Sequence, residues 1–506
     1  MTADVSTRKR ICALLLALGV LAAAGAALAG SAQAAAYAPG VVVVGVAPRT
    51  PARVRDATLV EAGMASARSA GADVREIALR PGVSVAAAIR RLRGRAGVRW
   101  AVPDYIAHIA TAGAPSGIAF PFGLLTRRAD QITPTPFAPD DPGDAGVPGG
   151  WAQLQWNFAG QYGVGAEQAW GNLIADGRPG GSGVTVAVLD TGIAYANRGR
   201  FVRSPDFAAS QFVAGYDFVG HSPYAEDRNG HGTLVAGEIA EETNNDVGVT
   251  GLAYGVRLMP VRVLNSEGNG SATTIARGIY FAVNHHAQII NLSLEFNAGS
   301  VSAAQIPQLI AALRYAYDKG VLVVAASGNE GAAQLSYPAK DPYALAVGAT
   351  TIDGCLASYS NYGNGLGLVA PGGGGDAALA DDANCRPGAT FGPDDNIIQE
   401  TFAIAPPPRT NPRQFDLNTS YFGTSMAAPE VSAAAALVIA SGVLGPHPTP
   451  TEIIDRLEQT ATPLGAGGKD DPEHFGAGLL DAAAATAPPG STGGTTGPSG
   501  TTGASG

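Results

Sequence analysis

Residues 421–441 read YFGTSMAAPEVSAAAALVIAS, and after the first turn almost every side chain is small or apolar. A helix without a polar stripe is buried on every side, so the stretch predicts a helix at the centre of a large core. Pro429 lacks an N–H and is tolerated only in the first turn, which places the helix start close to Ser425. The Ser425 hydroxyl then lies where unpaired N–H groups stabilise negative charge. Taken alone, the position favours a helix cap over a catalytic residue, because serine is among the preferred caps.

The whole chain has the composition of a globular protein. Its 506 residues are 46% hydrophobic and 15% charged, which allows one large domain with accessories or two to three domains. The formal net charge of −10 argues against nucleic acid as a partner, because no basic surface dominates.

The N-terminus has the pattern of an export signal. Residues 8–10 are basic, residues 11–30 are apolar, and small-x-small cleavage sites occur at 27–29 and 32–34. We expect residues 1–34 to be removed, and the protein to be secreted, extracellular or periplasmic, with no membrane contact afterwards. The alternative is an uncleaved anchor, because the apolar run approaches the roughly 20 residues that span a bilayer.

Three cysteines occur, and Cys12 lies within the signal. The remaining pair, Cys355 and Cys385, predicts one disulfide in an exported protein. Two free buried thiols are the alternative.

Patterns along the chain indicate a small unit followed by a large one. Residues 41–48 are strand-like, 83–94 helix-like and 98–110 extended, and arginines are frequent over 75–99. This basic unit suits docking onto the acidic remainder. A stretch rich in Pro, Gly, Ala and Asp follows as a linker, and the chain ends in a low-complexity tail.

The large unit alternates apolar strands with helical patterns. Continuous apolar strands between helices such as 273–286 indicate an α/β fold with a mostly parallel sheet and helices on both faces. The predicted strands are residues 184–190, 257–264, 288–294, 321–327 and 344–350.

Four polar residues stand on glycine-flanked turns that leave apolar elements. Asp190 ends a strand, His231 begins a helical pattern, Asn329 follows another strand, and Ser425 opens the buried helix. An acid, a base and a nucleophile are what acyl transfer needs, because a serine hydroxyl cannot attack unaided. His231 would take the proton, Asp190 would orient the imidazole, and the Asn329 amide with the Ser425 N–H would stabilise the oxyanion.

The motifs LDTGI, NGHGTLVAG, AASGNEG and FGTSMAAP, in this order, resemble those of the subtilisin-like serine proteases (subtilases) over residues 151–485. The triad order and the oxyanion logic are those of subtilisin itself. Leu234 departs from the second histidine common in the family, at a position outside the triad. The resemblance implies a three-layer α/β fold, with a mostly parallel sheet between helices, and a secreted serine endopeptidase that works through an acyl-enzyme. It also implies a monomer that acts on proteins or peptides.

The resemblance extends to the basic unit, which is similar to the family's α+β propeptide and would inhibit the enzyme until it cleaves itself free. The implied domains are a signal peptide (1–34), a propeptide (35–111), a linker or processing region (112–139), a catalytic domain (140–487) and a tail (488–506).

The resemblance also implies a structural Ca²⁺, for which oxygen donors are chemically suitable. An ordinary turn is the alternative. The implied ligands are Asp141, Asp206, Thr243, Asn245, Val247 and Val249.

By the same resemblance, substrate adds as a strand between two extended edges. The implied substrate-binding residues are Gly268, Asn269, Gly270, Ser293, Leu294, Glu295, Ala326, Ser327, Gly328 and Glu330.

Glu295 stands where relatives commonly have glycine in the pocket for the residue before the cut, and Glu330 and Ser336 lie at its floor. The hypothesis is that this pocket accepts both basic and large apolar side chains. The alternative is that Glu295 turns to solvent and only the broad apolar preference remains.

Two other functions compete with a protease. A lipase or esterase of the α/β-hydrolase class would carry G-x-S-x-G and the order Ser, Asp, His, and Ser425 lacks both. A subtilase-like binding protein without catalysis would have lost at least one of the four chemical residues, and all four are present.

Overall fold

A computed structural model describes residues 35–112, 134–144, 146–379, 382–403 and 411–488. From Ala36 onward the described residues belong to one compact unit. The predicted signal peptide and all but the first residue of the predicted tail lie outside the described residues, and so does most of the linker. The predicted domain boundaries stay predictions.

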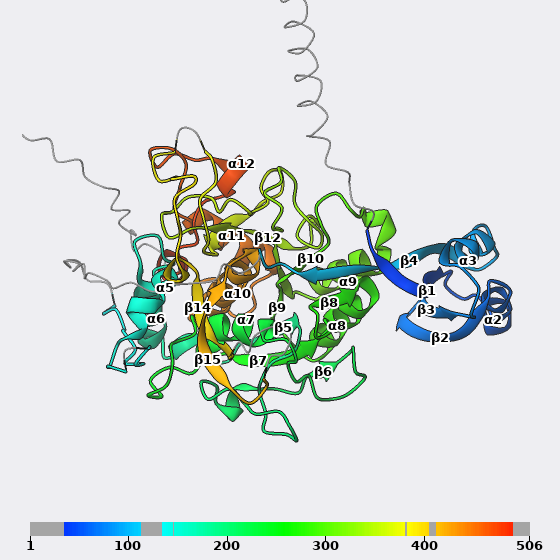
Figure 1. The fold of residues 1–506 in the computed structure, drawn as a ribbon, viewed down its shortest axis with the longest axis horizontal. Coiled ribbons are helices and arrows are strands. Elements are labelled where there is room, and N and C mark those ends of the chain that lie inside the picture. Colours follow the sequence, from blue (N-terminus) through cyan, green and yellow to red (C-terminus); the bar gives the residue numbers. More distant parts are fainter. Residues whose placement is uncertain (1–34, 113–133, 145, 380–381, 404–410, 489–506) are drawn as a thin grey trace, which may run out of the picture. The chain divides into compact units, whose positions relative to one another are not determined.

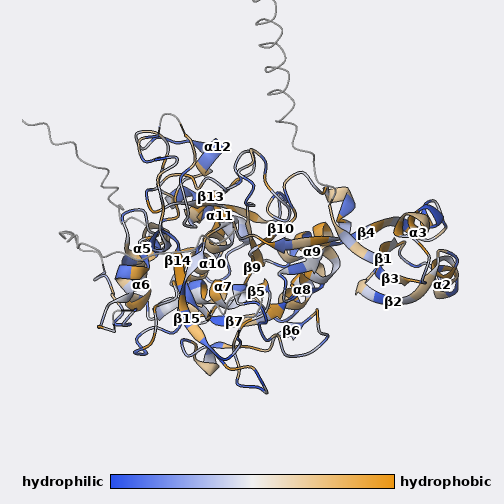
Figure 2. Ribbon diagram, in the orientation of Figure 1, coloured by the Kyte–Doolittle hydropathy of each residue, from blue (hydrophilic) through white to orange (hydrophobic). Residues whose placement is uncertain are grey.

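The N-terminal segment folds as an antiparallel sheet with two helices. Its elements are β1 (Tyr37–Val46), α2 (Ala52–Glu61), β2 (Met64–Gly71), β3 (Val74–Leu79), α3 (Val85–Leu92) and β4 (Val98–Ile109), and its strands are ordered β4-β1-β3-β2. Figure 2 shows both hydrophilic and hydrophobic residues on α3, whose Ala88 and Leu92 pack on Val44 and Ile77. The predicted α+β unit is confirmed, with α2, β2 and β3 added to the elements expected from the sequence.

Seven parallel strands form the central sheet, in the order β13-β12-β11-β9-β5-β7-β6. Their bounds are β5 Thr185–Asp190, β6 Tyr216–Asp217, β7 Arg257–Arg262, β9 Ile289–Leu292, β11 Leu322–Ala326, β12 Leu345–Thr350 and β13 Leu368–Pro371. The five predicted strands are confirmed. The other two are the edge strands β6 and β13, which are too short to show a pattern.

Helices cover both faces of this sheet. Val186 and Val188 of β5 belong to the core cluster that includes α7 (His231–Ala240) and α10 (Thr424–Ser441). Leu189 faces the other way, because a Cβ on Gly278 of α8 (Ala272–Asn284) would lie 3.0 Å from it. α9 (Pro307–Asp318) packs beside α8. Since strand side chains alternate between faces, the predicted three-layer α/β fold is confirmed.

Helix α10 lies inside the core, as its sequence predicts. It contacts β5, β9, β11, β12 and β13 as well as α7. Among the described residues α10 alone is long and apolar enough to cross a membrane, and 83% of it is buried inside the protein. It is therefore placed as the core helix of a globular domain.

The remaining elements surround this core. The helices are α4 (Trp151–Leu154), α5 (Trp156–Ala159), α6 (Ala166–Ala175), α11 (Pro450–Thr460), α12 (Pro472–Phe475) and α13 (Ala482–Thr486). β14 (Ile397–Phe402) and β15 (Phe415–Tyr421) pair as an antiparallel ribbon. Two short strands, β8 (Asn269–Ser271) and β10 (Leu294–Glu295), both pair with β4.

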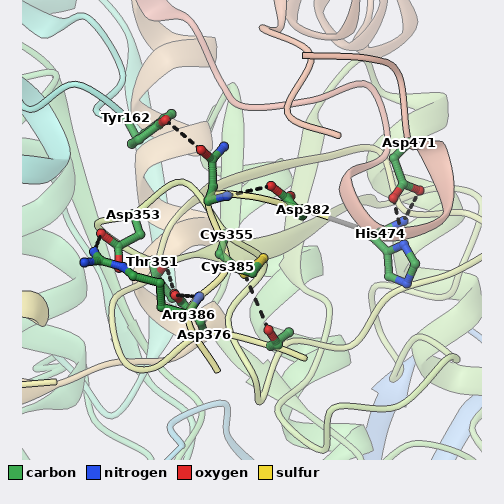
Figure 3. Close-up of a disulfide and its surroundings, with 12 residues drawn as sticks. Tyr162, Thr351, Asp353, Cys355, Asp376, Asp382, Cys385, Arg386, Asp471 and His474 are labelled. Atoms are coloured by element: carbon green, nitrogen blue, oxygen red, sulfur yellow. Dashed lines mark hydrogen bonds and ion pairs between the residues drawn. A yellow bond between two sulfur atoms is a disulfide. The ribbon is translucent and has the colours of Figure 1, made fainter. Parts of the chain in front are cut away.

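Cys355 and Cys385 form a disulfide, as the sequence predicts (Figure 3). The bridge joins residues 30 positions apart, with a Cα–Cα distance of 5.0 Å. Close by, Arg386 pairs with Asp353, and Thr351 donates a hydrogen bond to Asp376. The bridge therefore closes a long, mostly irregular segment of the large unit.

We predict that the double variant Cys355→Ala/Cys385→Ala lowers the free energy of unfolding by up to about 3.6 kcal/mol, the loop-closure value for a loop of this length. Denaturant unfolding measures the change. Reductant should produce the same loss in the wild type and none in the variant. Equal stability of the wild type and the double variant would contradict the prediction.

Candidate active site

Asp190 and His231 meet where β5 ends and α7 begins. His231 Nδ1 lies 2.8 Å from Asp190 Oδ1, and both side chains are fully buried. The Thr191 N–H donates to the same carboxylate oxygen at 2.6 Å. A Cβ on Gly232 would lie 2.2 Å from the Gly192 carbonyl oxygen, so a glycine is required for α7 to start this close to the strand.

Ser425 lies in the first turn of α10 and is fully buried. Its N–H donates to the Ala110 carbonyl oxygen at 3.1 Å. Its hydroxyl donates to the Ser293 carbonyl oxygen, also at 3.1 Å. His231 Nε2 has no hydrogen-bond partner among the described residues. Asp190 and His231 are therefore joined, whereas the Ser425 hydroxyl is directed at Ser293.

Asn329 is fixed against the start of α10. Its Oδ1 accepts hydrogen bonds from the Thr424 N–H at 2.9 Å and the Thr424 hydroxyl at 3.1 Å. Its Nδ2 lies 3.3 Å from Glu295 Oε1. The amide oxygen is thus fully engaged. The amide nitrogen donates one of its two hydrogens to Glu295, which leaves the second hydrogen available to donate.

The end of β4 lies between β8 and β10 (Figure 1). It pairs antiparallel with both, with His108 opposite Asn269 on one side and Glu295 on the other. The Ala110 N–H donates to the Ser293 carbonyl at 3.3 Å. A Cβ on Gly423 would lie 2.7 Å from the Ala110 carbonyl oxygen. These contacts hold an extended backbone against Ser425.

Glu295 is buried beside this strand, with 2% of its surface exposed. One carboxylate oxygen accepts from the Asn329 N–H and the other from the Asn329 amide, both at 3.3 Å. Burial, with the charge of Glu330 adding to it, raises the pKa of Glu295 to about 7. The alternative in which Glu295 turns to solvent is excluded.

The other predicted pocket residues gather around Gly328. A Cβ on Gly328 would lie 2.2 Å from Asn361 Nδ2, 2.5 Å from Ser336 Oγ and 2.6 Å from Glu295 Oε2. Asn361 Nδ2 also donates to Glu330 Oε2 at 2.6 Å. Polar side chains therefore fill the space beyond Gly328.

The six residues predicted as calcium ligands lie in or beside one loop. Asn245 contacts both acids, through its N–H to Asp141 Oδ1 at 3.2 Å and its Nδ2 to Asp206 Oδ1 at 2.8 Å. Asp206 Oδ2 accepts from the Val249 N–H at 3.0 Å, and the Val247 N–H donates to Asn245 Oδ1. Thr243 donates or accepts a hydrogen bond with Thr250. Among the described residues no group of three His, Cys, Asp or Glu is arranged to hold a metal.

Comparison with known families gives a match to the Subtilase family over residues 181–478, more than half of the chain. The chain belongs to the subtilase family. Its subtilase domain is that of a subtilisin-type serine endopeptidase.

Named relatives agree with this assignment. The subtilase is 39% identical over 306 residues to Subtilisin Savinase of Lederbergia lenta, a match covering 60% of this chain and 91% of that protein. It is also 39% identical to an alkaline protease of Alkalihalobacillus alcalophilus, of which the match covers 65%.

Two solved structures are similar. A protease of Pseudoalteromonas arctica has a TM-score of 0.54 and 28% identity, covering 69% of this chain and 98% of that one. Fervidolysin of Fervidobacterium pennivorans has a TM-score of 0.62, covering 89% of this chain and 61% of that one. At 23% identity, the second match shows the fold alone.

Three residues of the site were missed from the sequence. Asp227 accepts hydrogen bonds from Thr191, Asn229, Gly230 and Thr233, and so fixes the turn before His231. An acid two residues before Asn229-Gly230, at a helix start, was the available signal. No sequence signal pointed to Thr424 or Asn361, because their hydrogen bonds in the site are with residues distant in the chain.

Proposed function

We propose that the subtilase hydrolyses peptide bonds through Asp190, His231 and Ser425, with an acyl-enzyme intermediate. The observation that carries the proposal is the buried contact of His231 Nδ1 with Asp190, next to a Ser425 N–H that donates to the carbonyl of an extended strand. The Ser425 hydroxyl attacks the carbonyl carbon and His231 Nε2 takes its proton. Asp190 holds the imidazole tautomer and stabilises the imidazolium.

The developing oxyanion needs donors that are already in place. The Ser425 N–H is one donor, and Asn329 Nδ2 is the second. Because Thr424 holds the Asn329 oxygen, the nitrogen keeps its direction during the reaction. His231 then returns its proton to the leaving amine, and water repeats the sequence on the acyl-enzyme. The alternative is a secreted binding protein without catalysis. The presence of all four chemical groups in the sequence argues against it.

We further propose that the chain is a self-processing zymogen, with the Ala110–Thr111 bond as the bond that is cut. The Ala110 carbonyl occupies the position of a substrate carbonyl, since it accepts from the Ser425 N–H. The strand before it is paired on both sides, as a bound substrate would be. The propeptide then acts as an intramolecular inhibitor, and the processed chain begins at Thr111.

Export is proposed from the sequence alone, through residues 1–34 as the signal peptide. The natural substrates would then be proteins or peptides outside the cytoplasm. We propose that the enzyme acts on them as a monomer.

A structural Ca²⁺ fits the loop around Asn245. The donor set is entirely oxygen, and Asp141 Oδ2 is buried without a hydrogen-bond partner among the described residues. The ligands would be Asp141, Asp206 and the Asn245 side chain, with carbonyl oxygens completing the set. These carbonyls would belong to Thr243, Val247 and Val249. Asn245 now presents its amide nitrogen to Asp206, so its oxygen would have to turn toward the ion. A bound ion supplies stability and no catalytic step.

The buried Glu295 changes the expected substrate preference. Its carboxylate is already bonded to Asn329, and it fills the space beside Gly328. The residue lodged before the proposed cut is Ala110, one of the smallest. We therefore propose a preference for small side chains before the cut, in place of basic and large apolar ones.

Ser425→Ala should abolish peptide hydrolysis and leave the precursor at full length. For subtilisin itself, loss of the nucleophile lowers kcat on the order of a million-fold. Mass and N-terminal sequence of protein made in a protease-free host measure processing, and the wild type should begin at Thr111. Ser441→Ala, at the far end of the same helix, is the control and should mature normally. Processing of the Ser425→Ala protein would refute self-cleavage.

Glu295→Gly should raise kcat/KM for a peptide with Phe before the cut, relative to Ala, by roughly 10–100-fold, the value of burying one aromatic side chain. Glu295→Gln is the matched control, because it removes the charge and keeps the volume, so the wild-type preference should persist. A matched Arg peptide separates charge from size. A Phe-to-Ala ratio that Glu295→Gly leaves unchanged would rule out occlusion by this side chain.

Calcium should raise the unfolding midpoint and EDTA should lower it, because an ion that binds only the folded state stabilises it by mass action. The gain is about 2.7 kcal/mol at a hundredfold excess over Kd. Asp206→Asn should lose the response to both. A wild-type unfolding midpoint that changes with neither EDTA nor calcium would contradict the proposed calcium site.

A further inference from the structure

Two buried glutamates join the helices that carry the proposed catalytic residues. Glu238 is on α7, two turns after His231, and Glu430 is on α10, five residues after Ser425. Both are fully buried. The two helices contact each other directly, so any force between these carboxyl groups acts on the positions of His231 and Ser425.

The hydrogen bonds of this pair are incomplete if both groups are carboxylates. One amide nitrogen, Asn157 Nδ2 of α5, donates to Glu238 Oε2 at 3.2 Å and to Glu430 Oε1 at 2.8 Å. Glu238 Oε1 and Glu430 Oε2 are buried and accept no hydrogen bond from a described donor. The two carboxyl groups are close enough to share a hydrogen bond if one of them is protonated, and Gln399 of β14 lies beside Glu238. A proton on one carboxyl supplies the donor that is missing.

The charged groups around the pair do not offset its charge. Glu241 lies at the C-terminal end of α7 and is affected by the charge of Glu238. Glu400 on β14 and Asp206 act on Glu241 in turn. All are acids, and two carboxylates in contact away from water cannot both ionise without a large cost. Burial raises the pKa of Glu238 to about 8. Burial, with the charge of Glu238 adding to it, raises the pKa of Glu430 well above its usual range.

We propose that Glu238 and Glu430 hold one proton between them, and that this shared proton keeps α7 packed against α10 and His231 in place beside Ser425. The two glutamates are positioning residues, since neither touches substrate. The functional half of this inference rests on the proposed triad. Loss of the proton at high pH leaves two like charges between the helices, which sets an alkaline limit for this protein.

The direction of the pH effect follows from proton linkage. A carboxyl whose pKa is raised by folding keeps its proton in the folded state after the unfolded chain has released it. Its stabilisation is complete below the unfolded pKa of about 4.3 and is lost as pH rises toward the folded value of about 8. Within that window, each retained proton makes unfolding about tenfold more favourable per pH unit.

The test uses the full chain with Ser425→Ala, so that no self-digestion occurs. Denaturant unfolding is measured between about pH 5 and pH 9, without and with Glu430→Gln. The amide that this substitution introduces donates to the Glu238 carboxylate, which replaces the shared proton by a hydrogen bond that does not titrate. The slope of stability against pH should therefore become shallower by one proton. Glu238→Gln should do the same.

Glu458→Gln is the matched control, because Glu458 on α11 is also partly buried with a raised pKa but lies outside this pair. In Glu458→Gln, the part of the slope of stability against pH that comes from Glu238 and Glu430 should be unchanged. Difference infrared spectra provide a second readout, in which the wild type at neutral pH shows a protonated-carboxyl band that both Gln variants lose. An unchanged slope together with an unchanged band in both Gln variants would overturn the shared proton.

The positioning role is tested in the active enzyme. The fall of kcat/KM on the alkaline side should begin at a higher pH in Glu430→Gln than in the wild type. Each profile is expressed relative to the value that the same protein reaches at acidic pH. A shallower stability slope with an unmoved alkaline limb would overturn the positioning role. A protein without peptidase activity would refute the proposed function instead, because the unfolding and infrared measurements do not depend on catalysis.

Discussion

The burial of α10 on every side is the constraint on which the rest of this subtilase depends. The helix contacts five strands of the central sheet and the helix that begins with His231. A core this closely packed accepts only small side chains where backbones approach, and overpacking costs about 1–3 kcal/mol. The four alanines at 433–436, all fully buried, are the result. Because the helix cannot shift, the Ser425 N–H has a fixed position and direction relative to β10.

The same core contains many acids and few cations. Arg262 pairs with Asp217 in a buried salt bridge, whereas Asp190, Asp227 and Glu295 are held by N–H, hydroxyl or imidazole donors. Neutral donors stabilise a carboxylate less than a full positive charge does. Among these three acids, burial raises the pKa of Glu295 to about 7. The proton proposed to be shared by Glu238 and Glu430 is a second case in which a buried acid would link stability to pH.

Much of the fold was predictable because its signals are local. The five central strands are continuous apolar runs, and the helix that begins at His231 follows a glycine, Gly230, at its N-cap. The contact of Asp190 with His231 was expected because acyl transfer needs an acid that orients the base, and because the motifs around both residues resemble those of the subtilases. Other features could not be predicted, since they join distant residues. Asn157 and Glu430 lie 273 positions apart. Glu295 shares its space with Ser336 and Asn361, and a glycine at position 328 leaves room for all three side chains. No short pattern encodes such contacts.

In the proposed zymogen, the strand β4 of the N-terminal sheet would act both as a substrate mimic and as an inhibitor. Near Ser425 it relies on backbone hydrogen bonds, which any extended peptide can make. Further away it has contacts that a substrate lacks. Asp104, 2% exposed, accepts from the N–H and hydroxyl of Thr273 at the start of α8, and Arg277 pairs with Glu76. Linked contacts raise the effective concentration of the strand at the cleft. The proposed cut after Ala110 would leave these contacts in place. Cleavage and release of this segment would then be separate steps, and the second would depend on the surface of α8.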